Sequence, residues 1–340
     1  GTVIAREQTY VHTFYKKEAT AQQPATSKEE GNLVAFSGPD FKATFDKQSG
    51  LLTSYLYKKH EYILNGQGPR PFFWRAPTDN DYGANLPVRL KAWKEASYQE
   101  PKAESFQVTP GSNATTVKVT YRFPQTDARW DITYKIYASG VIKVDNRFMA
   151  EGDQAPMIPR VGLRMQLPES FTDLTYYGRG PKENYRDRRT SQFIGEYAIP
   201  VKDMYEPYVR PQENNHRTDI YWCALTDKTQ RGLLLIADRT FELNASNYPL
   251  ESMDSGDTID NGAPRTEKTH HRHLTDPLPE KMVDLFIDYR MMGVGGDDSW
   301  GATAHEPYLI RPGKENAIEY GFSLVPFDKK EDYKYLIRQY

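Results

Sequence analysis

Apolar and polar residues alternate along most of this chain, and this period of two is the pattern that most restricts its fold. Successive side chains of a β-strand point to opposite faces of a sheet, so alternation is typical of strands with one buried face. Four segments show it clearly, at 117–123, 130–136, 283–289 and 318–324. Clusters of Gly, Pro, Asn and Asp separate such segments at short intervals. Many short strands with turns between them predict an all-β fold, a large antiparallel sandwich or barrel.

Helix is expected to be scarce and confined to a few short elements. The best helical candidate is the segment 86–96, in which Leu86, Leu90 and Trp93 lie on one side at helical spacing. The turn 138–140 joins two alternating segments and predicts a β-hairpin. Both features fit a chain built mainly from antiparallel strands.

The charge and cysteine content exclude several classes of function. The 340 residues include 44 basic and 46 acidic ones, so the chain lacks the excess of positive charge that nucleic acid or an anionic membrane requires. Its longest aliphatic run, 233–237, is far too short to span a bilayer. The single cysteine, Cys223, permits neither a disulfide framework nor a cysteine-based zinc site. We therefore expect no nucleic-acid partner, no membrane partner and no metal held by this chain.

The N-terminal region differs in composition from the rest of the chain. Residues 16–32 are polar and charged, without an aromatic or β-branched run, and are typical of a linker. Residues 1–15 alternate like the last strand of a small sandwich that is separated from its other strands. This pattern suggests a fragment of a longer protein, whose main domain here is predicted to span residues 33–340.

Seven carboxylates stand in Gly- and Pro-rich contexts that favour ordered loops: Asp79, Asp81, Glu183, Asp187, Glu213, Asp297 and Asp298. Glycoside hydrolysis needs two carboxylates that face one bond, about 5–5.5 Å apart for retention or about 6.5–9.5 Å apart for inversion. The sequence does not show which of the seven converge. Capping of a turn is the alternative role for each, because carboxylates in turns commonly accept backbone N–H groups.

The stretch THHRHL holds three histidines. On a strand, His271 and His273 would share one face. Such a pair could bind a metal, or could serve as acid and base in a sugar epimerase. The alternative is a polar strand face beside Arg272, and no third ligand at a metal-binding spacing stands nearby.

The stretch FWRAPTDNDYG combines aromatic, basic and acidic residues before a glycine. Arg75 is expected to form a bidentate pair with Asp79 or Asp81. The run of Asp79, Asn80 and Asp81 is similar to a calcium loop but lacks the remaining ligands. Gly83 begins a segment of small residues that could move.

The stretch GVGGDDSW is expected to form a stiff turn. Gly295 and Gly296 permit positive φ, so the chain can bend sharply there. Asp297, Asp298 and Ser299 can accept hydrogen bonds from nearby backbone N–H groups and lock the turn. Two adjacent carboxylates make a poor metal site by themselves, because hard cations prefer about six oxygen ligands.

Trp300 would stand at the tip of this turn. An indole ring stacks well on the apolar face of a pyranose, and tyrosine and tryptophan suit surfaces that are partly wet and partly apolar. A tryptophan of the core is the alternative, and the local sequence does not choose between the two.

The C-terminal region of bacterial β-galactosidases of glycoside hydrolase family two resembles this chain at five motifs. They stand in the same order and at roughly the same spacing, and here they read FWRAPTDNDYG, YGRGPKENYRDR, MYEPYVRPQENNHR, THHRHL and GVGGDDSW. The resemblance extends from about residue 33 to Phe327. Residues 1–15 are similar to the closing strand of the immunoglobulin-like domain that precedes this region in the family.

The resemblance implies a large antiparallel super-sandwich, similar in architecture to galactose mutarotase. It also implies that this chain holds no catalytic residue and no cofactor, because the family's two catalytic glutamates and its magnesium ligands sit on a central (β/α)8 barrel. The implied partners are that barrel, the other domains of the same polypeptide and a galactoside substrate. The full-length enzyme is expected to be a homo-oligomer of the bacterial cytoplasm or periplasm. It would hydrolyse terminal β-D-galactosides with retention, and this chain alone is expected to hydrolyse nothing.

The implied role of the chain is to complete the wall of the active site. Trp300 stands at the position of a tryptophan that forms one wall of the substrate pocket in the family. Asp79–Asp81 and Gly83 match a loop at the mouth of that pocket. The sequence departs from the commonest family pattern at Arg210, where an apolar or aromatic residue is frequent, and this departure puts a minor cation site there in doubt.

Two other functions are left open by the sequence. A free-standing carbohydrate-binding module would bind galactose saturably without any other domain. A mutarotase-like aldose epimerase would bring His271 or His273 together with a carboxylate in a concave cleft.

Overall fold

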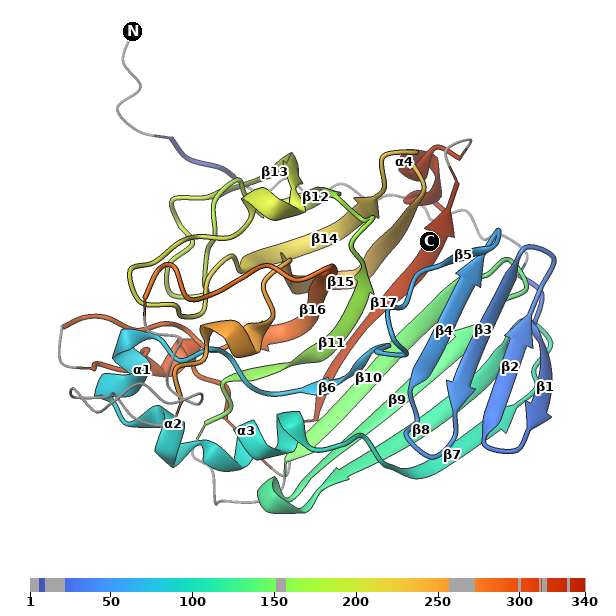
Figure 1. Cartoon of the computed structure of the whole chain (residues 1–340), viewed down its shortest axis with the longest axis horizontal. Helices are drawn as coiled ribbons and strands as arrows, with labels where there is room; N and C mark the ends of the chain where they lie inside the picture. Colours follow the sequence, from blue (N-terminus) through green and yellow to red (C-terminus); the bar gives the residue numbers. More distant parts are fainter. Residues whose placement is uncertain are drawn as a thin grey trace, which may run out of the picture.

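The computed structural model describes residues 6–9, 22–150, 157–256, 273–298, 301–311, 313, 317–328 and 331–339 (Figure 1). Within these ranges the chain folds into two antiparallel sheets, one of five strands and one of twelve. The predicted all-β class, a large antiparallel sandwich with few short helices, is confirmed. None of the helices described is long and apolar enough to span a bilayer.

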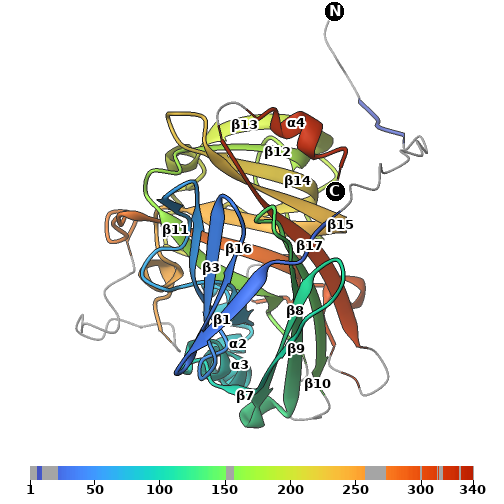
Figure 2. The ribbon, with the colours of Figure 1, turned by 90° about the vertical axis from the view of Figure 1, so that its right-hand side faces the viewer.

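The five-stranded sheet is a meander, in which each strand pairs with the next one along the chain. Its strands are β1 (Thr26–Glu30), β2 (Leu33–Ser37), β3 (Phe41–Asp46), β4 (Leu52–Tyr57) and β5 (His60–Glu61). Phe45 packs edge-on against Tyr134 of the larger sheet, with ring centroids 5.0 Å apart. The two sheets therefore lie face to face in this part of the molecule (Figure 2).

Strand β1 falls within the segment 16–32, which composition alone assigns to a linker. All five residues of β1 are exposed, and the strand pairs with β2 at the edge of its sheet. A strand with two exposed faces needs no apolar residues, so its sequence carries no alternation that could reveal it.

The twelve-stranded sheet follows the order β13-β12-β14-β15-β17-β10-β9-β8-β7, and β16, β11 and β6 branch from it. Its strands are β6 (Arg70–Phe72), β7 (Ala103–Thr109), β8 (Thr115–Phe123), β9 (Ala128–Ile136), β10 (Ile142–Ala150), β11 (Arg160–Pro168), β12 (Asp173–Gly180), β13 (Phe193–Pro200), β14 (Arg217–Thr226), β15 (Gly232–Ser246), β16 (Met282–Met291) and β17 (Ile318–Phe327). The branch lies in β15, whose residues 232–237 pair with β17 and whose residues 242–246 pair with β16.

The alternation in β8 and β9 is confirmed as the inward face of the sandwich. Val119 of β8 and Ile132 of β9 are almost completely buried, as the period of two predicts. The predicted hairpin is also confirmed, because β9 and β10 pair antiparallel with Ile136 opposite Ile142.

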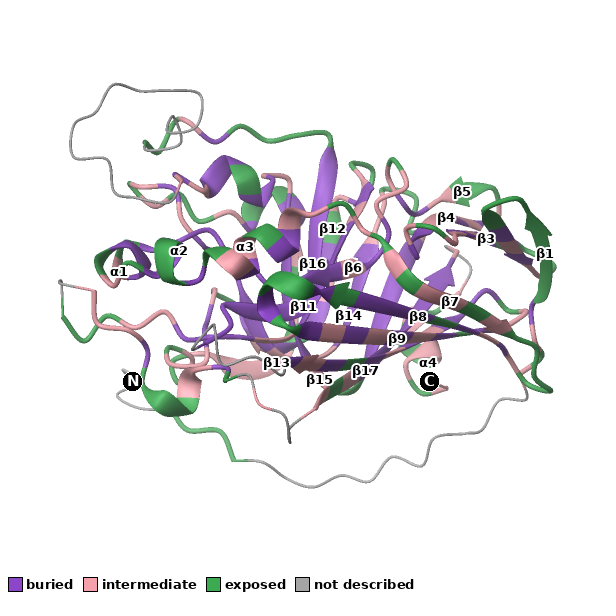
Figure 3. Ribbon diagram, turned by 90° about the horizontal axis from the view of Figure 1, so that it is seen from below, coloured by how far each residue is buried: buried purple, intermediate pink, exposed green. Residues whose placement is uncertain are grey.

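Phe73 lies at the centre of an aromatic cluster in the core. Its ring contacts four others at centroid distances of 4.9 to 5.5 Å, namely Trp93, Phe123, Trp130 and Phe148. Tilted and edge-on pairs of this kind stabilise a core beyond the burial of their area. Figure 3 shows the buried residues along the middle of the sheets, and the exposed ones at β1.

Strand β16 differs from the predicted pattern of one buried face, because its second face is buried as well. That face carries Asp284 and Asp288, which lie against arginines of β11. Arg164 Nε donates to Asp284 Oδ1 at 2.8 Å, and Arg160 Nε lies 3.2 Å from Asp288 Oδ2. Alternation cannot distinguish a solvated polar face from one that is closed by buried ion pairs.

The helices are short and lie mostly at one end of the sandwich (Figure 1). They are α1 (Asp79–Gly83), α2 (Leu86–Arg89), α3 (Lys91–Tyr98) and α4 (Tyr333–Leu336), with four 3-10 turns at η1 (Pro124–Thr126), η2 (Val201–Asp203), η3 (Leu250–Met253) and η4 (Glu306–Tyr308). The helical segment expected over 86–96 is confirmed, but it forms two short helices, since Leu90 has φ −112° and ψ 18° and separates α2 from α3. Leu90 and Trp93 are nevertheless both fully buried.

Candidate functional site

Four of the five sequence motifs meet at one end of the sandwich. The neighbouring strands β12, β14, β15, β16, β11 and β6 all begin or end there, because adjacent antiparallel strands alternate in direction. Four segments connect to these strand ends, at 73–83, 181–189, 204–216 and 292–298, and we call them the loop face (Figure 1).

Arg75 is the centre of the loop face, with only 2% of its surface exposed. Its Nε and Nη2 donate to Asp81 Oδ2 and Oδ1 at 3.0 and 2.8 Å, so the predicted bidentate pair is confirmed for Asp81. Its Nη1 and Nη2 also donate to the carbonyl oxygens of Met292 and Gly293, at 2.8 and 3.1 Å. Burial by itself lowers the pKa of Arg75, but the carboxylate of Asp81 outweighs that effect and raises the pKa.

The acidic run 79–81 forms the first turn of α1. Thr78 Oγ1 accepts from the backbone N–H of Asp81 at 3.1 Å, and Asp81 Oδ2 accepts from that of Thr78 at 3.0 Å, which is a capping box. Asp79 is largely exposed and its Oδ1 lies 3.2 Å from Arg210 Nε. The two carboxylates therefore face different arginines and share no ligand.

The turn of GVGGDDSW is described as far as Asp298, and Ser299 and Trp300 lie outside the described residues. Gly295 and Gly296 have φ of +69° and +106°, so the predicted positive φ is confirmed. Asp298 Oδ1 accepts from the backbone N–H of Ala302 at 3.2 Å. Asp297 pairs with His305 in the returning half of the loop.

Two further side chains of the loop face hold the beginning of this turn. Asp187 accepts from the backbone N–H groups of Val294 and Gly295, at 3.1 and 2.8 Å. Asn80 Nδ2 donates to the carbonyl oxygen of Val294 at 3.3 Å. On the far side, a side chain at Gly301 would overlap the backbone of Gly83, so the loop returns directly against the end of α1.

Each of the seven candidate carboxylates has a partner of its own. The pairs already described account for the two in α1, for Asp187 and for the two in the glycine turn. Of the other two, Glu183 Oε2 accepts from the backbone N–H of Asn215 at 2.7 Å, and Glu213 Oε1 lies 3.5 Å from Arg160 Nη2. Asp81, Asp187, Asp298 and Glu183 accept backbone N–H groups, as in the turn-capping alternative that the sequence left open, whereas the remaining three pair with an arginine or a histidine.

The histidines of THHRHL are only partly described, because His271 lies outside the described residues. His273 is exposed in a turn, where its backbone N–H donates to Asp276 Oδ2 at 3.0 Å. His273 therefore lies in a turn closed by Asp276 and not on a strand, so the shared strand face considered for the histidines does not include it.

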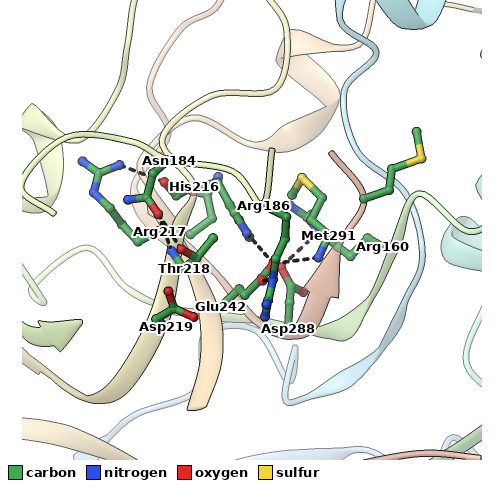
Figure 4. Close-up of polar contacts among 12 residues, drawn as sticks. Arg160, Asn184, Arg186, His216, Arg217, Thr218, Asp219, Glu242, Asp288 and Met291 are labelled. Carbon is green, nitrogen blue, oxygen red and sulfur yellow. Dashed lines mark hydrogen bonds and ion pairs between the residues drawn. The ribbon is translucent and has the colours of Figure 1, made fainter. Parts of the chain in front are cut away.

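A different histidine meets a carboxylate. Nε2 of His216 lies 2.8 Å from Oε2 of Glu242, and the two side chains are 0% and 1% exposed (Figure 4). Glu242 also accepts from Arg186 Nε and, at 2.7 Å, from the backbone N–H of Met291. No signal in the sequence points to this pair, because 26 residues separate the two partners and neither belongs to a known ligand spacing.

Two hollows adjoin these residues. The cavity beside Arg75 and Met292 has a volume of about 10 Å³, which is room for about one water molecule. A wider groove of about 1190 Å³ is lined by polar side chains that include Arg186, Asp219 and Arg290. The first is too small for a sugar and the second is polar and open, so neither has the form that is typical of small-molecule sites.

Two solved structures match most of the length of this chain. A putative mutarotase from Salmonella typhimurium has a TM-score of 0.49 and 10% identity, covering 92% of this chain and 97% of its own. A galactose 1-epimerase from Lactobacillus acidophilus has a TM-score of 0.45 and 7% identity, covering 91% and 99%. Similarity at this level indicates nothing about activity.

Curated relatives are considerably more similar in sequence. The β-galactosidase of Priestia megaterium is 33% identical over 291 residues, which are 85% of this chain and 26% of that protein. The β-galactosidase of Lactobacillus delbrueckii subsp. bulgaricus is 32% identical over 308 residues, 88% of this chain and 28% of that protein. That of Streptococcus thermophilus is 28% identical over 333 residues, 96% and 30%. The chain thus spans somewhat more than a quarter of the length of these relatives.

A family model named for the small chain of β-galactosidase matches residues 37–324. The match includes all four segments of the loop face and every strand from β6 to β16. Because it covers far more than half of the sequence, the chain belongs to the family of β-galactosidase small chains.

Proposed function

We propose that this chain is the C-terminal part of a bacterial β-galactosidase of glycoside hydrolase family two. The whole enzyme would hydrolyse terminal β-D-galactosides, lactose among them, with retention of configuration. The five motifs of the sequence and the relatives named β-galactosidase support this assignment. The catalytic glutamates and the magnesium site belong, in this proposal, to a barrel domain outside the chain, and the full-length protein is a homo-oligomer.

The role proposed for this chain is to hold one wall of the galactoside pocket, and one observation carries it. The backbone at 292–295 is held from two sides, by Arg75 through carbonyl oxygens and by Asp187 through N–H groups. A residue that must meet a ligand in one fixed position needs such a rigid support. Trp300 follows this support after five residues and would stack on the sugar ring.

The state of the carboxylates supports the view that the reaction is catalysed elsewhere. A general acid or a nucleophile must be free to contact the substrate. The seven candidates are instead engaged by arginines, a histidine or backbone N–H groups of this chain. The buried pair of His216 and Glu242 is closed to solvent, so it does not favour an epimerase.

Two experiments test the proposal. The purified 340-residue chain should show no turnover of a chromogenic β-galactoside above the rate without protein, and calorimetry should detect no saturable binding of galactose. In the complete enzyme, Trp300→Ala should raise KM about tenfold, since the loss of one aromatic contact of about 1.4 kcal/mol corresponds to that factor. Trp300→Phe should recover part of this loss, because it restores a ring. Turnover by the chain alone, or an unchanged KM in Trp300→Ala, would contradict the proposal.

A further inference from the structure

The turn that leads to Trp300 has almost no regular secondary structure, yet each of the four backbone N–H groups at 293–296 has an acceptor. The N–H of Gly293 donates to the carbonyl oxygen of Tyr308 at 2.9 Å, and that of Gly296 donates to the carbonyl oxygen of Ala302 at 3.2 Å. Both acceptors belong to the returning half of the same loop. Within its described residues, the loop therefore supplies partners for the N–H groups of Gly293 and Gly296 but not for those of Val294 and Gly295.

Asp187, in another segment of the loop face, provides the acceptors for the two N–H groups in the middle. Its Oδ1 accepts from Val294 N at 3.1 Å, and its Oδ2 accepts from Gly295 N at 2.8 Å. A carboxylate offers two acceptor oxygens and a negative charge, so both bonds are charge-assisted. Asparagine, the neutral side chain of the same size, has only one acceptor oxygen and no negative charge.

The glycine at 293 is explained by the same contact. A Cβ at Gly293 would lie 2.5 Å from Asp187 Oδ2, which is too close for any real side chain. The φ of Gly293 is not positive, so its backbone conformation does not require a glycine. The close approach of Asp187, together with the Cβ of Ala304 at 2.8 Å, leaves no room for a side chain.

Asp187 is itself held in position by the core. It stands in a two-residue turn between Tyr185 and Arg188, whose backbones exchange hydrogen bonds at 3.2 and 2.8 Å. Tyr185 is 1% exposed and stacks on His216, with ring centroids 5.5 Å apart. The adjacent Arg186 binds Glu242 in the buried cluster (Figure 4). The turn is therefore anchored by the two residues that precede Asp187.

We propose that Asp187 is a positioning residue of the galactoside site, which acts by fixing the backbone of residues 293–295 and through it the contact between Trp300 and the sugar. This inference rests on the proposed role of Trp300. Asp187 does not touch the substrate in this proposal, and its carboxylate takes no part in proton transfer.

The first test uses the 340-residue chain alone and does not depend on any enzymatic activity. Hydrogen exchange at the amides of Val294 and Gly295 should be fast in Asp187→Ala and intermediate in Asp187→Asn, which keeps one acceptor oxygen. The matched control is Asp227, which accepts from the backbone N–H groups of Thr229 and Arg231 at 2.7 and 3.1 Å. Asp227 follows the opposite end of β14 from the loop face, so Asp227→Ala should leave both amides unchanged. Equal exchange in all variants would overturn the proposal.

The second test uses the complete enzyme. Because Asp187 acts through Trp300 in this proposal, its loss should not exceed the loss of the Trp300 contact itself, so kcat/KM should fall by about tenfold in Asp187→Ala and by about threefold in Asp187→Asn. Most of the change should lie in KM, because the sugar contact is made in both the ground state and the transition state. Asp227→Ala should leave both constants unchanged.

A double variant separates this inference from the proposed function. If Asp187 acts through Trp300, then Asp187→Ala should have little further effect in a Trp300→Ala background, because residues in one chain of contacts are not additive. Full additivity would overturn the inference and leave the role of Trp300 intact. An unchanged KM in Trp300→Ala alone would instead count against the proposed function. Should Asp187→Ala fold poorly, Asp187→Asn gives the same comparison with a smaller change.

Discussion

The carboxylate of Asp288 occupies the space in which a side chain at Gly162 would stand. A Cβ built at Gly162 would overlap Asp288 Oδ1, and the register of β11 and β16 shifts between Val161 and Gly162. A bulge at this point re-aims the strand and lets the aspartate approach the backbone. Asp288 is thereby kept beside Arg160, with Nε and Oδ2 3.2 Å apart and both side chains fully buried.

Substitution of Gly162 by alanine should therefore destabilise the fold. The new methyl group must push Asp288 away from its arginine or shift the strand, and overpacking of this kind costs about 3 kcal/mol at the upper end of its usual range. Urea unfolding at pH 7 should show a clearly lower midpoint. The control is Gly313→Ala, where no heavy atom lies within 4 Å of the added Cβ, and the change should stay within about 0.5 kcal/mol. Equal midpoints for the two variants would mean that the packing at Gly162 is looser than described.

Two neighbouring aspartates of α1 should respond very differently to the same substitution. Asp81→Asn leaves the buried guanidinium of Arg75 without its counter-charge, and removal of one partner of a buried pair costs about 3–5 kcal/mol. Asp79→Asn removes an exposed partner of Arg210, which is worth about 0–1 kcal/mol. Thermal unfolding of both variants checks the contrast, and a large loss in Asp79→Asn would contradict it.

Glu242 should make the stability of the chain depend on pH in the acid range. Burial by itself raises the pKa of Glu242, but the hydrogen bond from His216 and the charge of Arg186 outweigh it and lower the pKa from 4.5 to about 2. A group with a depressed pKa stabilises the fold above its unfolded value, and this stabilisation is lost as the pH falls from about 4.5 towards 2. The shift corresponds to about 3 kcal/mol at pH 7.

The matching experiment compares Glu242→Gln with the unmodified chain at several pH values. At pH 7 the variant should be less stable by about 3–5 kcal/mol, because Arg186 and His216 then face a neutral amide. The difference between the two proteins should shrink as the pH falls from 4.5 to 2, where the glutamate itself becomes neutral. Glu196→Gln is the control, since Glu196 is exposed and pairs with Lys334 at the surface. A difference that does not change with pH would show that the charge of Glu242 is unimportant.

The sequence predicted the layers of the fold better than their boundaries. Val119 and Ile132 lie on the inward faces that the period of two assigns to them, because burial on one side of a strand leaves a readable pattern. β1 and the second face of β16 were missed for opposite reasons. Both carry polar residues, but those of β1 face solvent, whereas Asp284 and Asp288 face arginines of β11.

The site was predictable where partners stand close together in the sequence. Arg75 and Asp81 are six residues apart, and their pairing follows from charge and local geometry. Asp187 was one of seven candidate carboxylates, but its contact with Val294 spans 107 residues and depends on the order of strands in the sheet. No local pattern reports such a contact. Trp300 lies outside the described residues, so its place in the pocket stays a prediction.

Cys223 should report on the opening of the sandwich. The thiol is fully buried in the core, opposite Tyr176 of β12 and Leu235 of β15, and burial raises its pKa. The thiolate is the reactive form, so an aromatic disulfide reagent should leave the native chain unmodified for hours and should modify one thiol per chain once the protein is unfolded in guanidinium.

At intermediate denaturant the rate of modification should follow the opening of β14, since Cys223 can react only after β12 or β15 separates from it. The Gly162→Ala variant gives the sharpest comparison, because its bulge lies on β11, two strands beyond β15. If the sandwich unfolds as one cooperative unit, the weakened bulge should speed the modification of Cys223 by the same factor by which it lowers global stability, about 150-fold for 3 kcal/mol. An unchanged rate would show that β12, β14 and β15 open independently of the arm of the sheet that carries the loop face.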